Sequence, residues 1–170
     1  MIYLVVGKSC SGKTQAREYL QSRLELPGFE ASAFFKEAFG RHLVENPSDL
    51  FGILGEDFVA REIGLQIPMN SGAIISGFRK KEEIAHIRTL GETRVIGLNA
   101  EDRTCYERAR SRGRDEYKTF MDFYTKKICA DYAMGLAEVM ANETDVIIGN
   151  ETNDLNALHA SLDKFLGELK

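Results

Sequence analysis

Glycine, lysine and threonine residues near the start of the chain are spaced in a way that suits phosphate binding. The stretch "VVGKSCSGKT" matches the Walker A pattern G-x-x-x-x-G-K-[ST]. In that pattern the glycines let backbone N–H groups turn toward a phosphate, the lysine contacts the β- and γ-phosphates, and the threonine hydroxyl ligates Mg²⁺. We therefore expect a nucleotide to bind with Mg²⁺ at Thr14 and with its phosphates inside a loop of eight residues: Gly7, Lys8, Ser9, Cys10, Ser11, Gly12, Lys13 and Thr14.

A second cluster of charged residues lies in the stretch "ERARSRGRDEYK", which contains Arg108, Arg110, Arg112 and Arg114. In isolation such a run is a solvated helix end. After a Walker A loop, arginines of this kind also fit a lid that closes over a transferring phosphoryl group, neutralises its charge and excludes water. We expect a lid at about residues 110–125, with Arg112 and Arg114 ahead of Arg108 as its catalytic residues.

Short apolar runs alternate with stretches of helical spacing along the whole chain. This alternation predicts a three-layer α/β/α fold of the P-loop NTPase type, with a five-stranded parallel sheet and helices on both faces. We expect a single domain over residues 1–170. The predicted strands are residues 1–6, 31–35, 72–76, 93–99 and 145–150, and the predicted helices are residues 13–24, 36–44, 48–66, 80–90, 101–110, 120–140 and 151–170.

Ligands of parallel sheets bind at the carboxyl ends of the strands. The residues that follow each predicted strand are therefore the candidates for a site. They are residues 7–14, 34–37, 76–79, 100–103 and 149–152.

Three stretches resemble the small P-loop kinases of the nucleotide-kinase type, above all the archaeal adenylate-kinase-related proteins and, less closely, the dephospho-coenzyme-A kinases. They are "SGFRKKEEI" (76–84), "RARSRGR" (108–114) and "GLAEVMANETDVIIGN" (135–150). The resemblance implies that ATP binds the Walker A loop, that Arg79 faces the phosphate of the acceptor, and that the lid arginines face the transferred phosphate. It also implies that Asn150, Glu151 and Thr152 lie near the adenine.

Two positions depart from the pattern of this family. Ser76 stands where the family has an aspartate that helps to hold Mg²⁺, and a hydroxyl is a poor substitute for a charge on a divalent ion. The family also has an aspartate after its second strand, where the nearest carboxylate here is Glu37. Three functions stay open: a kinase for a nucleotide or nucleotide-like phosphorylated small molecule, a catalytically weakened nucleotide-binding protein with a regulatory role, and an NTPase that needs no acceptor.

The composition excludes several other classes. A net charge of -4 argues against a general nucleic-acid-binding protein, and a hydrophobic content of 44% argues against disorder. The three cysteines are far apart in the sequence, so we expect reduced thiols. No apolar run approaches the roughly 20 residues of a membrane span and no signal peptide is evident, so we expect a cytoplasmic protein. No feature of the sequence specifies an oligomeric state.

Overall fold

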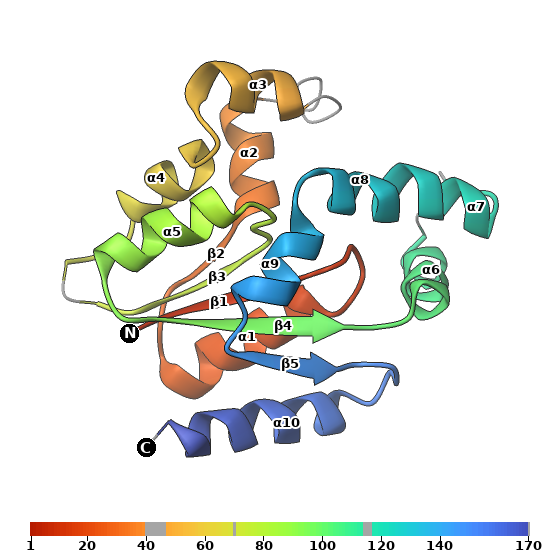
Figure 1. Ribbon diagram of the computed structural model, residues 1–170. Coiled ribbons are helices and arrows are strands. Elements are labelled where there is room, and N and C mark those ends of the chain that lie inside the picture. Colours follow the sequence, from red (N-terminus) through yellow and green to blue (C-terminus); the bar gives the residue numbers. More distant parts are fainter. Residues whose placement is uncertain (40–46, 70, 114–116, 170) are drawn as a thin grey trace.

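A computed structural model describes residues 1–39, 47–69, 71–113 and 117–169 of the chain (Figure 1). Its centre is a parallel sheet of five strands in the order β2-β3-β1-β4-β5, which confirms the predicted fold class. The strands are β1 (Ile2–Gly7), β2 (Gly28–Glu30), β3 (Ala73–Ser76), β4 (Thr93–Asn99) and β5 (Val146–Gly149).

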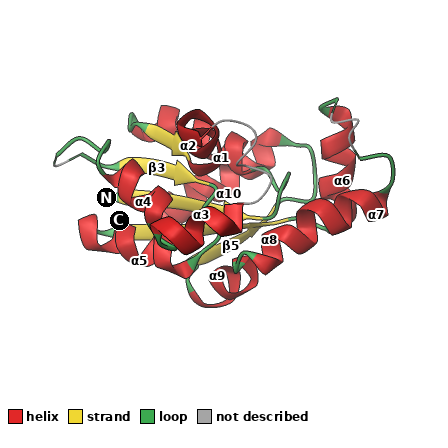
Figure 2. Cartoon of the chain, turned by 90° about the horizontal axis from the view of Figure 1, so that it is seen from above, coloured by secondary structure: helices red, strands yellow, loops and turns green. Residues whose placement is uncertain are grey.

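Helices cover both faces of the sheet, as Figures 1 and 2 show. One face packs against α1 (Lys13–Leu24) and α10 (Leu155–Glu168), and the other packs against α4 (Phe58–Gly64), α5 (Lys81–Leu90) and α9 (Leu136–Asn142). The side chains of β1 alternate between two hydrophobic clusters, with Leu4 in one and Val5 in the other. Because this central strand is buried on both faces, the loop that follows it rests on a well-packed base.

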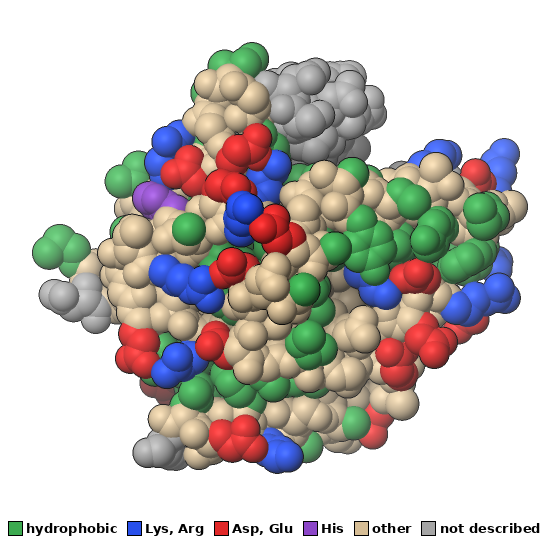
Figure 3. Space-filling view, in the orientation of Figure 1, with side chains coloured by type: hydrophobic (Ala, Val, Ile, Leu, Met, Phe, Trp, Pro, Cys, Tyr) green, Lys and Arg blue, Asp and Glu red, His purple; other side chains and the backbone are tan. Residues whose placement is uncertain are grey.

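A further group of helices lies beyond the carboxyl edge of the sheet. It consists of α6 (Asp102–Ser111), α7 (Phe120–Phe123), the π-helix η2 (Tyr124–Ile128) and α8 (Cys129–Ala133). Buried side chains of α6, α7 and η2 belong to a third hydrophobic cluster, which also includes Cys10 of the Walker A loop. On the outside, hydrophobic side chains gather over α7 and α8 (Figure 3), among them Met121 and Tyr132.

The prediction of the second strand was wrong. Residues 31–35 form the start of helix α2 (Ala31–Phe39), and the strand is the three-residue segment Gly28–Glu30 before it. That strand exists because β3 lies beside it, where Gly28 pairs with Ile74 and the Ile74 N–H donates to the Pro27 carbonyl at 2.8 Å. The segment that follows the strand is therefore not residues 34–37 but the start of α2.

Two predicted long helices are interrupted. The helix predicted over 48–66 is two helices, α3 (Pro47–Leu54) and α4, with a turn between them that Arg61 closes by donating to the Leu54 carbonyl at 2.6 Å. The helix predicted over 120–140 turns at Gly135 before α9 begins. Apolar spacing continues across both turns, so the sequence pattern did not reveal them. No helix among the described residues has the length and apolar character that a membrane crossing requires.

Candidate functional site

The Walker A loop is a tight backbone curl between β1 and α1. A Cβ atom at Gly7 would overlap the Leu98 carbonyl oxygen and lie 2.8 Å from Ser11 Oγ, so no larger residue fits there. Gly12 has a φ of 107°, in the left-handed region that favours glycine. Because glycine has no side chain, Gly12 also leaves the N-terminus of α1 without a side-chain cap. An uncapped helix N-terminus preceded by such a curl is suited to an anion.

The Lys13 side chain folds back over this loop. Its ammonium donates to the carbonyl oxygens of Gly7 at 2.8 Å and Lys8 at 2.6 Å. Burial, followed by the nearby charge of Arg79, lowers the pKa of Lys13 to about 8. A phosphate beside Lys13 would compensate for both effects, because an anion favours the charged form of the lysine.

An anion from the chain itself already lies against the loop. Asp131 of α8 is buried, and its Oδ2 accepts a hydrogen bond from the Ser9 N–H at 2.6 Å. Its Oδ1 accepts from Arg79 Nε, also at 2.6 Å. One N–H group of the loop, that of Ser9, therefore binds a carboxylate here, and a phosphate would bring a negative charge of the same kind. Sequence reasoning missed Asp131, since it is 122 residues from Ser9 and belongs to no motif.

Arg79 is held in place by the first turn of α5. The buried carboxylate of Glu83 accepts hydrogen bonds from the backbone N–H groups of Arg79 at 2.9 Å and Lys80 at 3.0 Å. Burial raises the pKa of Glu83 to about 7, although the two N–H donors and the neighbouring cations act in the opposite direction. The structure thus brings Arg79, as predicted, to the edge of the sheet where the Walker A loop lies.

The lid arginines lie in different surroundings. Arg108 is buried, and its Nη2 donates to the carbonyl oxygens of Asn150 at 2.8 Å and Thr152 at 2.5 Å. It therefore joins α6 to the segment after β5. Arg112 is exposed at the end of α6, and Arg114 lies outside the described residues. The catalytic roles of these three arginines stay predictions.

Asn150 connects the end of β5 to the Walker A loop. Its Nδ2 donates to the Ser11 carbonyl at 2.8 Å, and its backbone N–H donates to the Asn99 carbonyl at 2.7 Å. A Cβ atom at Gly12 would overlap the Asn150 amide, so the two residues are in close contact. The structure therefore places the predicted adenine-side residue directly behind the phosphate loop.

The corrected position of β2 reveals a carboxylate that the sequence analysis did not name. Glu30 ends β2 and pairs in register with Ser76, which in turn pairs with Val5 of β1. With strands about 4.8 Å apart, the Glu30 backbone lies about 10 Å from that of β1. The Glu30 carboxylate accepts from Ser32 Oγ at 2.7 Å and lies 3.9 Å from the guanidinium of Arg17. Glu37, the earlier candidate, is exposed on α2.

The residues at this edge fit Mg²⁺ only together with a nucleotide. Among the described residues, no group of three or more His, Cys, Asp and Glu side chains is placed to hold a metal ion. The Thr14 hydroxyl, on the first turn of α1, stays the predicted protein ligand for Mg²⁺. Mg²⁺ usually binds through one or two carboxylates plus substrate phosphates. Because β3 ends in Ser76 instead of a carboxylate, the phosphates would have to supply most of the ligands here.

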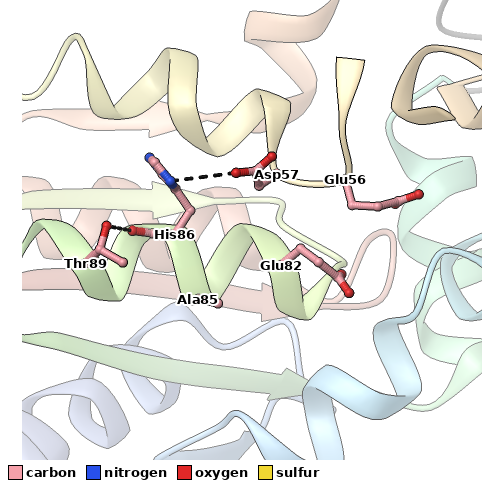
Figure 4. A pocket seen from close by; sticks show the side chains of 6 residues that line it. All are labelled: Glu56, Asp57, Glu82, Ala85, His86 and Thr89. Atoms are coloured by element: carbon pink, nitrogen blue, oxygen red, sulfur yellow. Dashed lines mark hydrogen bonds and ion pairs between the residues drawn. The ribbon is translucent and has the colours of Figure 1, made fainter. Parts of the chain in front are cut away.

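A separate pocket lies between α5 and the turn that precedes α4 (Figure 4) and is lined by Glu56, Asp57, Glu82, Ala85, His86 and Thr89. His86 Nδ1 is 3.8 Å from Asp57 Oδ2. Three carboxylates in the lining make this pocket unsuitable for phosphate groups. Its lining includes no residue of the Walker A loop, so it is not part of the candidate site.

Comparison with known proteins places the chain among P-loop proteins. A profile of the AAA domain family matches residues 4–129. A UPF0200 protein of Hyperthermus butylicus is 27% identical over 180 residues, which span 100% of this chain and 91% of that protein. A UPF0200 protein of Sulfurisphaera tokodaii is 22% identical over 156 residues, which span 89% of this chain and 88% of the other.

Solved structures of kinases share the fold. A shikimate kinase from Acinetobacter baumannii, in complex with shikimate, superposes with a TM-score of 0.71 at 15% identity, over 99% of this chain and 93% of that chain. A gluconokinase from Sinorhizobium meliloti gives a TM-score of 0.63 at 14% identity, over 98% and 94% of the two chains. At such low identity these likenesses show the fold alone. The specific resemblance to adenylate-kinase-related and dephospho-coenzyme-A kinases stays a prediction.

Proposed function

We propose that this chain, which belongs to the AAA domain family, is a kinase that transfers the γ-phosphate of ATP to a small molecule. The observation that carries the proposal is the convergence of three features at one edge of the sheet. The Walker A loop follows β1, Arg79 follows β3, and Glu30 ends β2, and these strands are neighbours in the order β2-β3-β1. A donor site, a cation and a carboxylate on adjacent strands are what phosphoryl transfer between two bound molecules requires.

On the donor side, the chain's own groups hold and orient the triphosphate. Loop N–H groups and the N-terminus of α1 receive the inner phosphates, and the Lys13 ammonium neutralises the β- and γ-phosphates. Bound Mg²⁺, held by Thr14 and phosphate oxygens, would supply further neutralisation of charge. Asn150 and Arg108 shape the segment beside the loop where the adenine of ATP is proposed to lie.

On the acceptor side, Glu30 is the proposed partner of the attacking group. A carboxylate that accepts a hydrogen bond or proton from the acceptor oxygen makes that oxygen a better nucleophile. Arg79 is proposed to face either a phosphate of the acceptor or the phosphoryl group that is being transferred. In the second position its positive charge would stabilise the negative charge of the transition state. A nucleotide or nucleotide-like phosphorylated molecule is therefore the acceptor class that we propose.

The lid belongs to this proposal as well. The described residues of the proposed lid, at about 110–113 and 117–125, include the end of α6, all of α7 and the start of η2, and Tyr117 and Phe123 belong to the cluster that includes Cys10 of the loop. We propose that Arg112 and Arg114 act from this segment on the transferred phosphate, within one domain that spans residues 1–170.

Ser76 favours a second candidate function, a nucleotide-binding protein with little or no catalysis. It ends β3 with a buried hydroxyl where a carboxylate would help to hold Mg²⁺. In that case ATP would bind and alter the structure without being consumed.

Phosphoryl transfer by variants of Glu30 and Glu37 distinguishes the proposed kinase from a protein that only binds a nucleotide. Nucleoside monophosphates, nucleosides and dephospho-coenzyme A are offered as acceptors with labelled ATP to the wild type and to the Glu30→Gln and Glu37→Gln variants. We expect Glu30→Gln to lower kcat by about 100-fold and Glu37→Gln to have little effect. Equal rates in all three proteins would remove Glu30 from the site, and absence of turnover with every acceptor would favour the second candidate.

A further inference from the structure

Asp131 joins the Walker A loop to Arg79, two groups that the proposed reaction assigns to phosphates. Its two carboxylate oxygens are each 2.6 Å from a donor, one from the Ser9 N–H in the loop and one from Arg79 Nε. The side chain of Asp131 is 4% exposed and that of Arg79 is 21% exposed, so solvent screens this ion pair only weakly.

Lys13 lies within the electrostatic reach of the same pair. Lys13 donates to the carbonyl oxygens of Gly7 and Lys8, and Asp131 accepts from the N–H of the next residue, so both charges lie against the same short stretch of the loop. In keeping with this, Arg79 lowers the pKa of Lys13 and Asp131 raises it. The lysine of a Walker A loop reaches the β- and γ-phosphates, whereas the inner phosphates lie against the loop N–H groups near the helix. Because both side chains contact the loop between Gly7 and Ser9, we infer that the Asp131 carboxylate lies on the γ-phosphate side of the site.

We propose that Asp131 is a built-in occupant of the γ-phosphate position, and that its displacement from Ser9 and Arg79 sets how well the site distinguishes a nucleoside triphosphate from a diphosphate. This inference rests on the proposed function for the identity of the ligand. A triphosphate brings its terminal phosphate to the donors that Asp131 holds, and two anions cannot share them. A diphosphate leaves the Asp131 contacts in place.

Displacement of the Asp131 carboxylate by a triphosphate has an energetic cost and a structural consequence. The cost is the loss of two charge-assisted hydrogen bonds, which weakens the binding of a triphosphate but not of a diphosphate. The consequence is that Arg79 becomes available to the terminal phosphate at the moment when that phosphate arrives. Asp131 is thus a positioning and selectivity residue rather than one that reacts.

The test compares the dissociation constants of ADP and of an ATP analogue that carries an imido bridge between its β- and γ-phosphates. The measured quantity is the dissociation constant of ADP divided by that of the analogue, so a higher ratio means a stronger preference for the triphosphate. It is measured by calorimetry in the presence of Mg²⁺ for the wild type, for Asp131→Asn, and for the control Asp163→Asn. Asp163 also pairs with an arginine, Arg23 at 3.2 Å, but its side chain is 45% exposed and it lies on α10. We expect the ratio to rise about tenfold in Asp131→Asn and to stay unchanged in the control.

A ratio that is unchanged or lower in Asp131→Asn would overturn the inference, because Asp131 would then remain in place and support the triphosphate. If the asparagine variant does not fold, Asp131→Ser has the same expected result. Tripolyphosphate and pyrophosphate give the same comparison without a base. In one outcome, the affinity for tripolyphosphate relative to pyrophosphate is about tenfold higher in the variant than in the wild type, and neither protein transfers phosphate from ATP. The inference about Asp131 then stands and the proposed kinase function fails. If transfer occurs and the ratios do not change, the kinase function stands and the inference fails.

Discussion

Replacement of Glu83 by glutamine should change how the stability of the protein depends on pH. Glu83 is 3% exposed, and burial raises its pKa from 4.5 to about 7. Between these two values the native state holds a proton that the unfolded chain has released, so this residue makes the protein less stable as pH rises through that window. The difference of about 2.5 pKa units corresponds to a loss of about 3 kcal/mol in the free energy of unfolding. The loss is complete above pH 7.

Glutamine is neutral at every pH, and its carbonyl oxygen still accepts from the backbone N–H groups of Arg79 and Lys80. The free energy of unfolding of Glu83→Gln relative to wild type should therefore rise by about 3 kcal/mol between pH 4.5 and 8. Urea denaturation followed by far-ultraviolet circular dichroism at one-unit steps of pH measures this difference. Glu82→Gln is the matched control, since Glu82 is the adjacent residue and is more exposed. If the Glu83→Gln and wild-type curves run parallel, the assigned pKa of Glu83 is wrong.

Three further predictions concern the nucleotide site. ATP with Mg²⁺ at 100 times its Kd should stabilise the wild type by about 2.7 kcal/mol in thermal unfolding, and Lys13→Ala should abolish most of this gain; an equal gain in both would place ATP elsewhere. Ser76→Asp should lower the Mg²⁺ concentration for half-maximal turnover by about tenfold, as a titration with Mg²⁺ would measure; an unchanged or higher requirement would mean that another carboxylate already serves the metal. Arg112→Ala should lower kcat by about 100-fold with little change in the Kd for ATP, and normal turnover would remove Arg112 from the lid.

Local sequence pattern was sufficient where a segment is determined by its own residues. The strand predicted at 93–99 is β4 with the same bounds, because a run of β-branched and apolar residues suits a buried parallel strand. The Walker A loop was recognised because its glycines, lysine and threonine lie within eight residues. In the structure the curled backbone of this loop leaves no space for a Cβ atom at Gly7, as the glycine of the motif implies.

Features that depend on distant partners were not predictable in the same way. The short strand β2 exists through its pairing with β3, so the apolar run after it was mistaken for the strand and Glu30 was overlooked. Asp131 meets Ser9 only because α8 folds back over the loop across 122 residues of sequence. The pKa of Glu83 likewise depends on its burial under the turn that carries Arg79.

The most direct test of the kinase proposal follows the γ-phosphate itself. Wild-type protein is incubated with γ-labelled ATP, Mg²⁺ and each acceptor in turn, and the products are separated to locate the label. We predict label on one phosphorylated acceptor, in an amount equal to the ADP formed, and no transferred label with Lys13→Ala. Label that stays in ATP, or that appears only as inorganic phosphate with every acceptor, would contradict it.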